Sequence, residues 1–351
     1  MKIGILTLPL HTNYGGILQA YALQTVLKGM GHEVLLIDSG IHKLSKYRII
    51  ARFLKHSILS FGKTRIQHIY GFRIRRFVKQ NFEILSENSV FDGKTFDAII
   101  VGSDQVWRKD YTENIEYYFL DFAKDWKIKR IVYAASFGID VWNYPSEKTN
   151  LCKQLASYFD YISVREESGI ELCKKYLGVD AYMMVDPTLL LAANEYKVIA
   201  SKNKYKVTSQ LLAYVLDATD EKNEILSYLV EQKRLEYYLL NQPSFFCMQY
   251  PSIEYWLDAF SNAQYVFTDS FHGCVFSIIF NIPFIAYGNK ERGITRFYSL
   301  LKMFGLEKRL ICSLDELPKA MDSPINWEYV NECIRTRQEL AIKTLEECLK
   351  N

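Results

Sequence analysis

The sequence predicts an α/β protein with two domains. Short β-branched and aromatic runs alternate with longer amphipathic segments along the chain, which is the pattern of βαβ units. The chain has 351 residues, more than one hydrophobic core usually contains. A proline at 187 follows a strand-like run and cannot continue a β-ladder. We therefore expect an N-terminal domain over residues 1–186, a C-terminal domain over 187–325, and a closing segment, 326–351.

Each element is predicted from its own local pattern. Apolar runs of four to six residues bounded by turn residues are expected to be buried strands, and longer periodic segments are expected to be helices. The expected strands are 2–6, 33–37, 96–101, 130–135, 161–164, 210–215, 235–240, 265–267 and 284–286. The expected helices are 16–30, 169–177, 220–231, 253–261, 273–280, 296–304 and 327–349.

Composition excludes several classes of protein. A net charge of +3 does not by itself indicate a nucleic-acid partner. Seven scattered cysteines without a C-x-x-C pair argue against a disulfide framework, an iron–sulfur cluster and a zinc ribbon, so no metal is expected. The first residues form a strand rather than a signal peptide, and no apolar run reaches the ~20 residues of a membrane span. We expect a cytoplasmic protein.

The turn between residues 267 and 273 is the first candidate site. Ser270 and His272 lie where a predicted strand meets the N-terminus of a helix, the place where open α/β sheets bind ligands and where free N–H groups favour anions. The other five histidines all lie within the first 68 residues. We expect Asp269 to orient the His272 ring as a catalytic acid, with Ser270 beside it in the binding site. The alternative is a structural histidine that caps a backbone carbonyl.

Two more predicted strands end in polar motifs. Asn13, Gly15 and Gly16 precede the first helix and form a plausible cradle for a phosphate or carboxylate, although two glycines in a tight turn are the simpler interpretation. Ser103 and Asp104 follow the strand ending at 101. Asp104 is expected either to bind a sugar hydroxyl or to cap the next helix.

Cations occupy two further positions. Arg165 follows a predicted strand, with ion pairing to a neighbouring glutamate on the surface as the alternative. The loop after residue 287 carries Lys290, Arg292 and Arg296, which together could neutralise a phosphate.

Residues 39–82 form a basic segment. It contains eleven Lys and Arg residues and no acidic residue, with apolar residues at helical spacing. One interpretation is a set of surface helices that pack their apolar faces on the first domain. The other adds that the cationic face contacts the anionic inner leaflet of the cell membrane and guides a polyprenyl-diphosphate-linked sugar toward Asn13 and Asp104.

Taken together, the separated motifs resemble those of the polysaccharide pyruvyl transferase family over almost the whole chain. The resemblance is carried by Asn13-Tyr14-Gly15-Gly16, Val101-Gly102-Ser103-Asp104-Gln105-Val106-Trp107, Ser163-Val164-Arg165-Glu166, Val185-Asp186-Pro187-Thr188 and Thr268-Asp269-Ser270-Phe271-His272-Gly273. It implies two Rossmann-like domains facing across a cleft, similar to the glycosyltransferase-B architecture, with the last helix packing back on the first domain. It also implies transfer of a pyruvyl group from phosphoenolpyruvate to two hydroxyls of a sugar, with no separate cofactor.

The resemblance also suggests roles for individual residues. Arg165, His272 and Lys290 match the Arg, His and Lys that the family uses around phosphoenolpyruvate. Some relatives have Arg-Leu-His where this chain has Ser270-Phe271-His272. One donor-site cation is therefore missing, and Arg292 or Arg296 is expected to replace it. Two other functions stay open: a nucleotide-sugar glycosyltransferase of the same architecture, and a non-catalytic member of a polysaccharide assembly complex.

Overall fold

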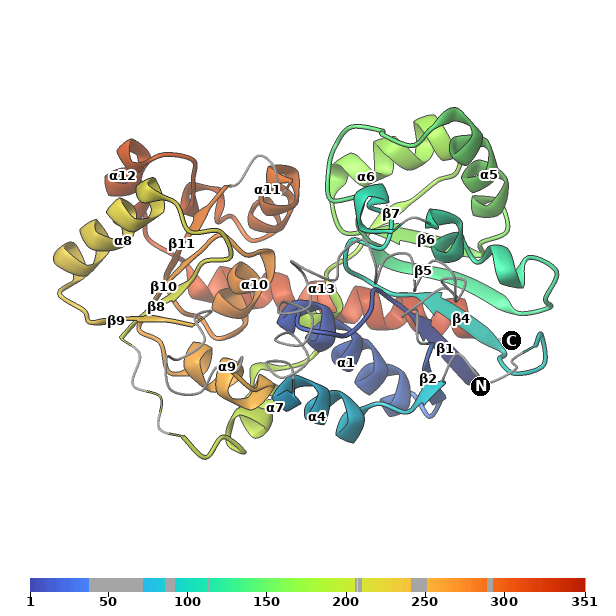
Figure 1. Ribbon diagram of the computed structural model, residues 1–351, viewed down its shortest axis with the longest axis horizontal. Helices are drawn as coiled ribbons and strands as arrows, with labels where there is room; N and C mark the ends of the chain where they lie inside the picture. Colours follow the sequence, from blue (N-terminus) through green and yellow to red (C-terminus); the bar gives the residue numbers. More distant parts are fainter. Residues whose placement is uncertain are drawn as a thin grey trace, which may run out of the picture.

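Two parallel β-sheets, each flanked by helices, lie side by side in the computed structural model (Figure 1). The structure describes residues 1–37, 72–85, 92–112, 114–205, 207, 210–240, 251–288 and 293–350. The predicted α/β fold with two parallel sheets is confirmed. Most of the basic segment, and also Lys290 and Arg292, lie outside the described residues.

The first sheet has its topological switch point beside β1. Its strand order is β3-β2-β1-β4-β5-β6-β7, and every pair is parallel. The chain leaves β1 on one side for β2 and returns on the other side at β4, so a crevice opens between the β1 and β4 ends. The strands are β1 (Lys2–Leu6), β2 (Glu33–Ile37), β3 (Ile84–Leu85), β4 (Ala98–Val101), β5 (Lys129–Ala135), β6 (Tyr161–Val164) and β7 (Tyr182–Met183).

The second sheet has the same kind of reversal between β8 and β10. Its order is β12-β11-β10-β8-β9, again with parallel pairs throughout. The strands are β8 (Leu211–Tyr214), β9 (Tyr237–Leu239), β10 (Tyr265–Thr268), β11 (Phe284–Tyr287) and β12 (Leu310–Ile311). Each sheet therefore offers one switch point at its carboxyl edge.

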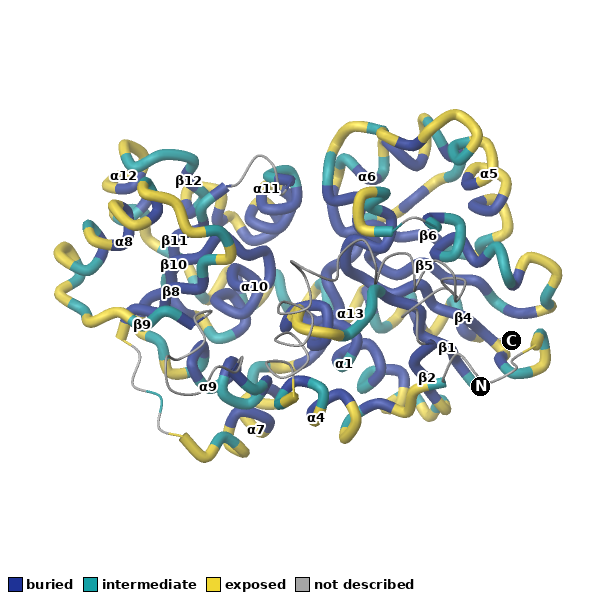
Figure 2. Tube along the Cα trace, in the orientation of Figure 1, coloured by how far each residue is buried: buried dark blue, intermediate teal, exposed yellow. Residues whose placement is uncertain are grey.

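Helices cover the sheets and bury their apolar residues between the layers (Figure 2). Those of the first half are α1 (Tyr14–Gly29), α4 (Phe72–Asn81), α5 (Ser146–Ala156) and α6 (Glu167–Leu172), which continues as a π-helical turn (Cys173–Leu177). Those of the second half are α7 (Ala193–Ala200), α8 (Asp220–Lys233), α9 (Ile253–Ser261), α10 (Phe271–Ile279), α11 (Ile294–Met303), α12 (Leu317–Asp322) and α13 (Trp327–Leu349).

Sequence patterns locate most elements, with differences at their ends. β1, β2, β6 and α13 have the predicted bounds. α10 begins two residues earlier than predicted, because the Ser270 hydroxyl accepts a hydrogen bond from the Gly273 N–H at 3.4 Å and so caps the helix. His272 consequently lies on the first turn of α10 and not in a loop. The two-residue strands β3 and β12 are too short to show a pattern and were not predicted.

Several contacts join the two halves. α13 runs across the middle of the molecule (Figure 1), with Gln338 donating to the Leu189 carbonyl at 2.6 Å and the Lys129 ammonium of β5 donating to the Cys348 carbonyl at 3.0 Å. A further contact joins α1 to α9: the Tyr14 ring stacks on the Trp256 ring, with centroids 5.5 Å apart.

α4 is the described part of the basic segment. Its buried residues are Ile74, Phe77 and Val78, and the Phe77 ring packs 5.7 Å from Tyr21 of α1. The Gln24 side chain donates to the Asn81 carbonyl at 2.8 Å. For this helix, the prediction that an apolar face packs on the first domain is confirmed.

Candidate functional site

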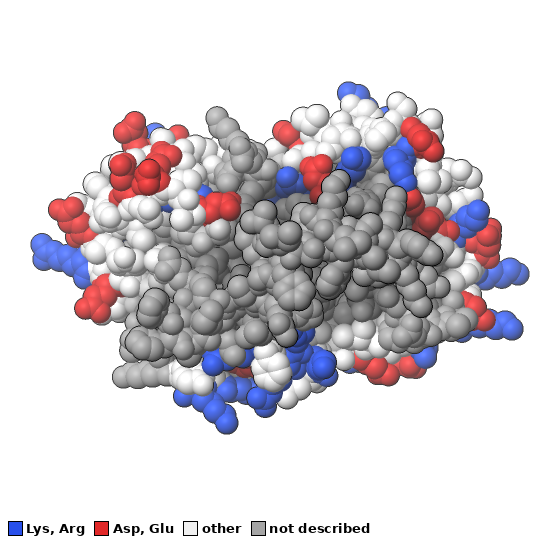
Figure 3. Space-filling view, in the orientation of Figure 1, with Lys and Arg blue, Asp and Glu red and all other residues white. Residues whose placement is uncertain are grey.

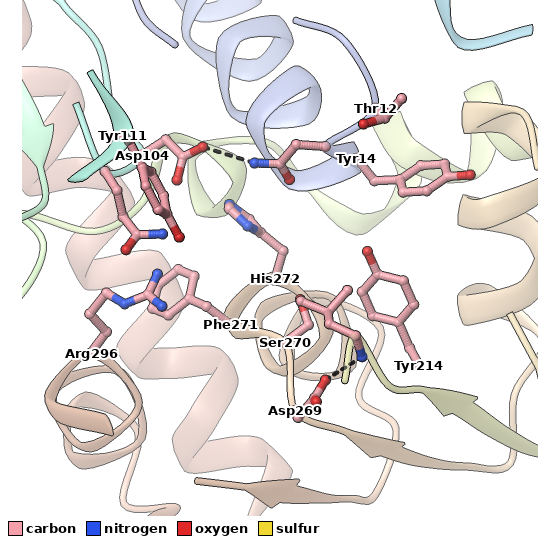
Figure 4. A pocket seen from close by; sticks show the side chains of 13 residues that line it. Thr12, Tyr14, Asp104, Tyr111, Tyr214, Asp269, Ser270, Phe271, His272 and Arg296 are labelled. Carbon is pink, nitrogen blue, oxygen red and sulfur yellow. Dashed lines mark hydrogen bonds between the residues drawn. The ribbon is translucent and has the colours of Figure 1, made fainter. Parts of the chain in front are cut away.

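A cavity of roughly 410 Å³ lies where the switch points of the two sheets face each other. Its walls come from the residues that follow β1, β4, β8 and β10, together with the first turn of α11 (Figure 4). The lining residues are Thr12, Asn13, Tyr14, Asp104, Gln105, Tyr111, Tyr214, Leu216, Asp269, Ser270, Phe271, His272 and Arg296. The sequence motifs that were predicted separately therefore meet in one place.

The wall from the first sheet is built on Asn13 and Asp104. The Asn13 amide donates to Asp104 Oδ2 at 3.0 Å, which bridges the ends of β1 and β4. Asp104 adopts a left-handed conformation with φ 72°, a strained state for a residue other than glycine and one that is concentrated at functional sites. Gly16 makes room for the pair, because a β-carbon there would lie 2.9 Å from Asn13 Nδ2 and 3.1 Å from Asp104 Oδ2.

The predicted cradle is a helix N-terminus and not a tight turn. α1 begins at Tyr14, so Gly15 and Gly16 lie in its first turn, where the backbone N–H groups have no partners further back in the helix. No side chain caps α1, and its first turn holds no acidic residue. This end of α1 is suited to an anion.

His272 reaches the cavity from the second sheet. Its side chain is buried, and its ring points from α10 toward the side of the cavity that holds Asp104 (Figure 4). The ring lies against Gly15, where a β-carbon would be 1.9 Å from Nδ1. Gly15 is therefore the residue of the first half that makes space for the histidine of the second.

Asp186 is the centre of a buried polar cluster behind the cavity. Its Oδ2 accepts from Arg165 Nη1 at 2.7 Å and from the Ser103 hydroxyl at 2.9 Å, and it lies 3.6 Å from His272 Nε2. Its Oδ1 accepts from the Thr188 hydroxyl at 2.7 Å. Burial alone would raise the pKa of Asp186, but the interactions with His272 and then Arg165 and Thr188 hold it well below its usual range. Asp186 is thus an anion beside His272.

Sequence reasoning did not assign Asp186 to the site. The Asp186-Pro187 pair was interpreted only as the end of a domain and as part of a family motif. The available signal was an acidic residue just after a strand, the same signal that identified Asp104.

The prediction that Asp269 orients the His272 ring is wrong. Asp269 Oδ1 accepts from the Leu216 N–H at 2.6 Å, and Oδ2 accepts from the Lys222 ammonium at 2.7 Å and from the Asp217 N–H at 3.1 Å. In Figure 4 the Asp269 carboxylate points away from the His272 ring, and the dashed line from it marks the hydrogen bond with the Leu216 N–H. Asp269 joins the ends of β8 and β10, so its role here is to shape the cavity wall.

Arg165 lies beneath the cavity wall and does not line it. Its side chain is 1% exposed, and its guanidinium carbon lies 4.2 Å from the centroid of the Phe271 ring. The alternative of surface pairing with a neighbouring glutamate is wrong: Glu166 accepts hydrogen bonds from the Ser136 hydroxyl at 2.9 Å and the Phe137 N–H at 2.8 Å, and Glu167 pairs with Lys302 at 2.9 Å. Arg165 Nε and Nη2 are buried with no hydrogen-bond partner among the described residues.

Among the described residues, Arg296 is the cation that lines the cavity. It lies on the first turn of α11, and its guanidinium carbon is 5.7 Å from the centroid of the Phe271 ring, which Arg165 also contacts. Burial and then the charge of Arg165 lower the pKa of Arg296 to about 10, so it remains cationic at neutral pH. Ser270 also lines the cavity as predicted, whereas Ser103 is fully buried and bonded to Asp186, so its prediction as a substrate-binding residue is wrong.

Sequence reasoning missed the aromatic part of the wall. Tyr14, Tyr111 and Tyr214 line the cavity, but in a chain with 25 tyrosines composition could not single them out. Among the described residues, no group of three or more His, Cys, Asp or Glu is placed to hold a metal ion. None of the described helices is both long and apolar enough to cross a membrane.

The two facing parallel sheets define a two-domain Rossmann-like protein similar to the glycosyltransferase-B architecture. Solved structures that share this fold include the following two. One is UDP-GlcNAc 2-epimerase from Methanocaldococcus jannaschii, with 14% identity over 97% of this chain and 99% of that one and a TM-score of 0.52. The other is a proposed UDP-N-acetylglucosamine 2-epimerase from Listeria monocytogenes, with 11% identity over 98% and 94% and a TM-score of 0.53. At such identities the likeness concerns the fold alone.

A sequence model of the family described as polysaccharide pyruvyl transferase matches residues 13–291. The chain belongs to this family, and the resemblance predicted from the motifs is confirmed. A search among curated proteins finds no match.

Proposed function

We propose that this protein transfers the pyruvyl group of phosphoenolpyruvate to two hydroxyls of one saccharide and forms a cyclic ketal. Membership of the family supports a transferase. The observation that carries the proposal is the pair of groups at the cavity: His272, which lies beside the buried Asp186 carboxylate, and the cation Arg296. They offer a proton donor and an anion site within one cavity.

The donor binds near the N-termini of α10 and α11. Phosphoenolpyruvate carries a phosphate and a carboxylate, and Arg296 supplies one charge at the cavity wall. The helix N-termini add partial positive charge. We expect Lys290 and Arg292, which precede α11 in the sequence and lie outside the described residues, to add charge to the donor site. Arg165 supports it from behind Phe271.

The reaction begins with a proton transfer from His272 to the methylene carbon of phosphoenolpyruvate, which becomes a methyl group and leaves C2 electrophilic. One sugar hydroxyl adds to C2 and gives up its proton, which restores the charge on His272. The bond from C2 to the phosphate oxygen breaks, and the second hydroxyl adds to C2. Its proton leaves with inorganic phosphate, so the products are the ketal and phosphate.

The acceptor sugar binds on the wall from the first sheet. Asp104 accepts a hydroxyl hydrogen bond there, and the amide of Asn13 holds the carboxylate in place at 3.0 Å. Gln105 offers a further polar group, and Tyr111 offers an aromatic face of the kind on which sugar rings pack. The saccharide is carried on a polyprenyl diphosphate.

Two alternatives use the same features differently. The cation at Arg296 and the helix N-termini also suit a diphosphate, so a nucleotide-sugar glycosyltransferase is the second candidate. A non-catalytic member of a polysaccharide assembly complex would keep the cavity without turnover. Ligand preference separates all three.

A peripheral contact with the anionic inner leaflet belongs to the same proposal. Lys and Arg gather at the lower edge of the molecule over α4 and α7, while Asp and Glu gather at the opposite edge over α8 and α12 (Figure 3). Phe72 at the start of α4 is 62% exposed, as is Tyr205, over which Arg73 lies at 5.6 Å. Exposed aromatic and cationic groups together suit an anionic lipid surface.

The proposed chemistry is tested with His272→Gln. Glutamine fills a similar space but cannot deliver a proton at neutral pH, so kcat should fall ~10²–10⁴-fold while phosphoenolpyruvate still binds. Turnover within about tenfold of the wild type, below that range, would remove His272 as the acid.

A further inference from the structure

We infer that Asp186 is the positioning residue for His272: its carboxylate accepts a hydrogen bond from the Nε2–H of the ring, which leaves Nδ1 to exchange a proton with the substrate. The inference rests on the proposed function only for its kinetic consequence. The arrangement of the two side chains can be tested without any substrate.

The geometry gives the two ring nitrogens different surroundings. Nε2 is buried and has no hydrogen-bond partner among the described residues, and Asp186 Oδ2 lies 3.6 Å from it. Nδ1 lies on the side of Gly15, in the cavity wall. A shift of a few tenths of an ångström would make the contact with Asp186 a hydrogen bond, since such bonds form at about 2.7–3.2 Å.

Asp186 is built to remain an anion in this role. Arg165 Nη1 supplies the charge-assisted bond at 2.7 Å, and the Ser103 hydroxyl donates to the same oxygen at 2.9 Å. The other oxygen is occupied by the Thr188 N–H at 3.0 Å and the Thr188 hydroxyl at 2.7 Å. With both oxygens fixed, the carboxylate cannot turn away from the ring. A carboxylate so held selects the tautomer of a neighbouring histidine that carries its proton on the facing nitrogen.

Gly15 completes the arrangement from the other side. Because a β-carbon at this position would overlap the ring, only glycine lets Nδ1 lie in the cavity wall while Nε2 lies near Asp186. His272 is thus held between two groups: the Asp186 carboxylate lies near Nε2 and favours a proton there, and the N-terminus of α1 lies near Nδ1.

The test is a nitrogen-15 NMR measurement on protein labelled at histidine, recorded at a pH at which the ring is neutral. The His272 signals are assigned by their loss in His272→Gln. We expect the wild type to carry its proton on Nε2, and Asp186→Asn to lose that preference. A wild-type ring protonated on Nδ1 would overturn the inference, whether or not Asp186→Asn folds.

Kinetics with phosphoenolpyruvate supply the second readout. Asp186→Asn should lower kcat roughly 10²–10⁴-fold, the range of a general acid, with KM for phosphoenolpyruvate changed only a few-fold. Asp160→Asn is the matched control: it makes the same change at a carboxylate that accepts a hydrogen bond from the Arg130 N–H at 2.7 Å and does not line the cavity, so both the His272 tautomer and kcat should stay near wild type. A changed tautomer with unchanged kcat would also overturn the inference. Wild-type protein with the Nε2 proton but no turnover would instead count against the proposed function.

Discussion

Gly15 and His272 lie in contact, although they are 257 positions apart in the chain and follow strands of different sheets. A β-carbon at Gly15 would be 1.9 Å from His272 Nδ1 and 2.1 Å from Cγ. No real side chain tolerates such an approach, so the contact fixes both the identity of residue 15 and the place of the ring. It also means that the two sheets must come together for the site to exist.

Gly15→Ala should therefore disable the site while it preserves the helix. Alanine is the better helix former by about 1 kcal/mol, so α1 itself should not be weakened. The added methyl group must displace the His272 ring, and we expect kcat to fall by at least ~10²-fold, the lower end for losing a general acid. Gly29→Ala, at the other end of the same helix, is the control, because its added β-carbon would meet no atom from another part of the described structure within 4 Å. Equal activity of the two variants would contradict this account.

Arg296→Ala should weaken the binding of phosphoenolpyruvate. The variant removes a charge from the cavity wall, and a hydrogen bond to a charged group is worth roughly 1.5–3 kcal/mol. Isothermal titration measures the change. Lys290→Ala should act in the same direction. Lys302→Ala removes an exposed cation of the same helix, α11, and should bind the donor like the wild type.

Arg165→Ala should behave differently from Arg296→Ala. It leaves Asp186 buried without its closest charged partner, and breaking a buried ion pair from one side costs about 3–5 kcal/mol of stability. Urea unfolding should show this loss, together with weaker donor binding. If Arg165→Ala were as stable as the wild type, the buried pair would not support the site in the way described.

Acid should weaken the fold through Asp186. Its folded pKa lies well below the value of about 3.9 for an unfolded aspartate, so its contribution to stability is complete above that value. As the pH falls below ~4, the unfolded chain takes up a proton that the folded protein does not, and the free energy of unfolding declines. The difference in free energy of unfolding between the wild type and Asp186→Asn should consequently become smaller as the pH falls. A difference independent of pH would show that the buried carboxylate is not the titrating group.

The proposed contact of α4 with an anionic membrane is tested by flotation with liposomes. Protein should float with anionic vesicles at low salt, and less at high salt, because each cation near an anionic surface contributes on the order of 1 kcal/mol. Replacing Arg73, Arg76 and Lys79 of α4 by glutamate should abolish flotation. The same replacement at the exposed residues Lys153, Lys174 and Lys319, away from α4, makes an equal change of charge and should not. Indifference to lipid charge would leave α4 as a packing helix only.

Local sequence signals were sufficient to predict most strands and the site residues that directly follow them. His272, Asn13 and Asp104 were predicted because each is polar and directly follows a buried run, and parallel strands bring such positions to one edge. The choice of partner for His272 could not be predicted in this way. Asp269 is its neighbour in sequence, but the reversal between β8 and β10 turns that carboxylate toward Leu216 and Lys222. Asp186 comes close only through the packing of the two sheets.

The burial of individual side chains was the second feature that the sequence could not predict. The sequence shows that Arg165 follows a strand, but not that its side chain is buried against the Phe271 ring and does not line the cavity. For the same reason the sequence could not show that Ser103 bonds to Asp186, because its distance from Asp186 along the chain is 83 positions. The first fact depends on how the second half covers the first, and the second on how the first sheet brings together the residues that follow β4 and β7.

Donor preference tests the central claim most directly. A ligand that binds only the folded state raises its apparent stability, so thermal unfolding is measured with phosphoenolpyruvate, UDP and UDP-sugars, for the wild type and for Arg296→Ala. At a concentration of 100 times Kd, stabilisation should be about 2.7 kcal/mol. We expect phosphoenolpyruvate to stabilise the wild type, Arg296→Ala to respond less at the same concentration, and the uridine nucleotides to have no effect. Stabilisation by the nucleotides and not by phosphoenolpyruvate would contradict the account and favour a glycosyltransferase.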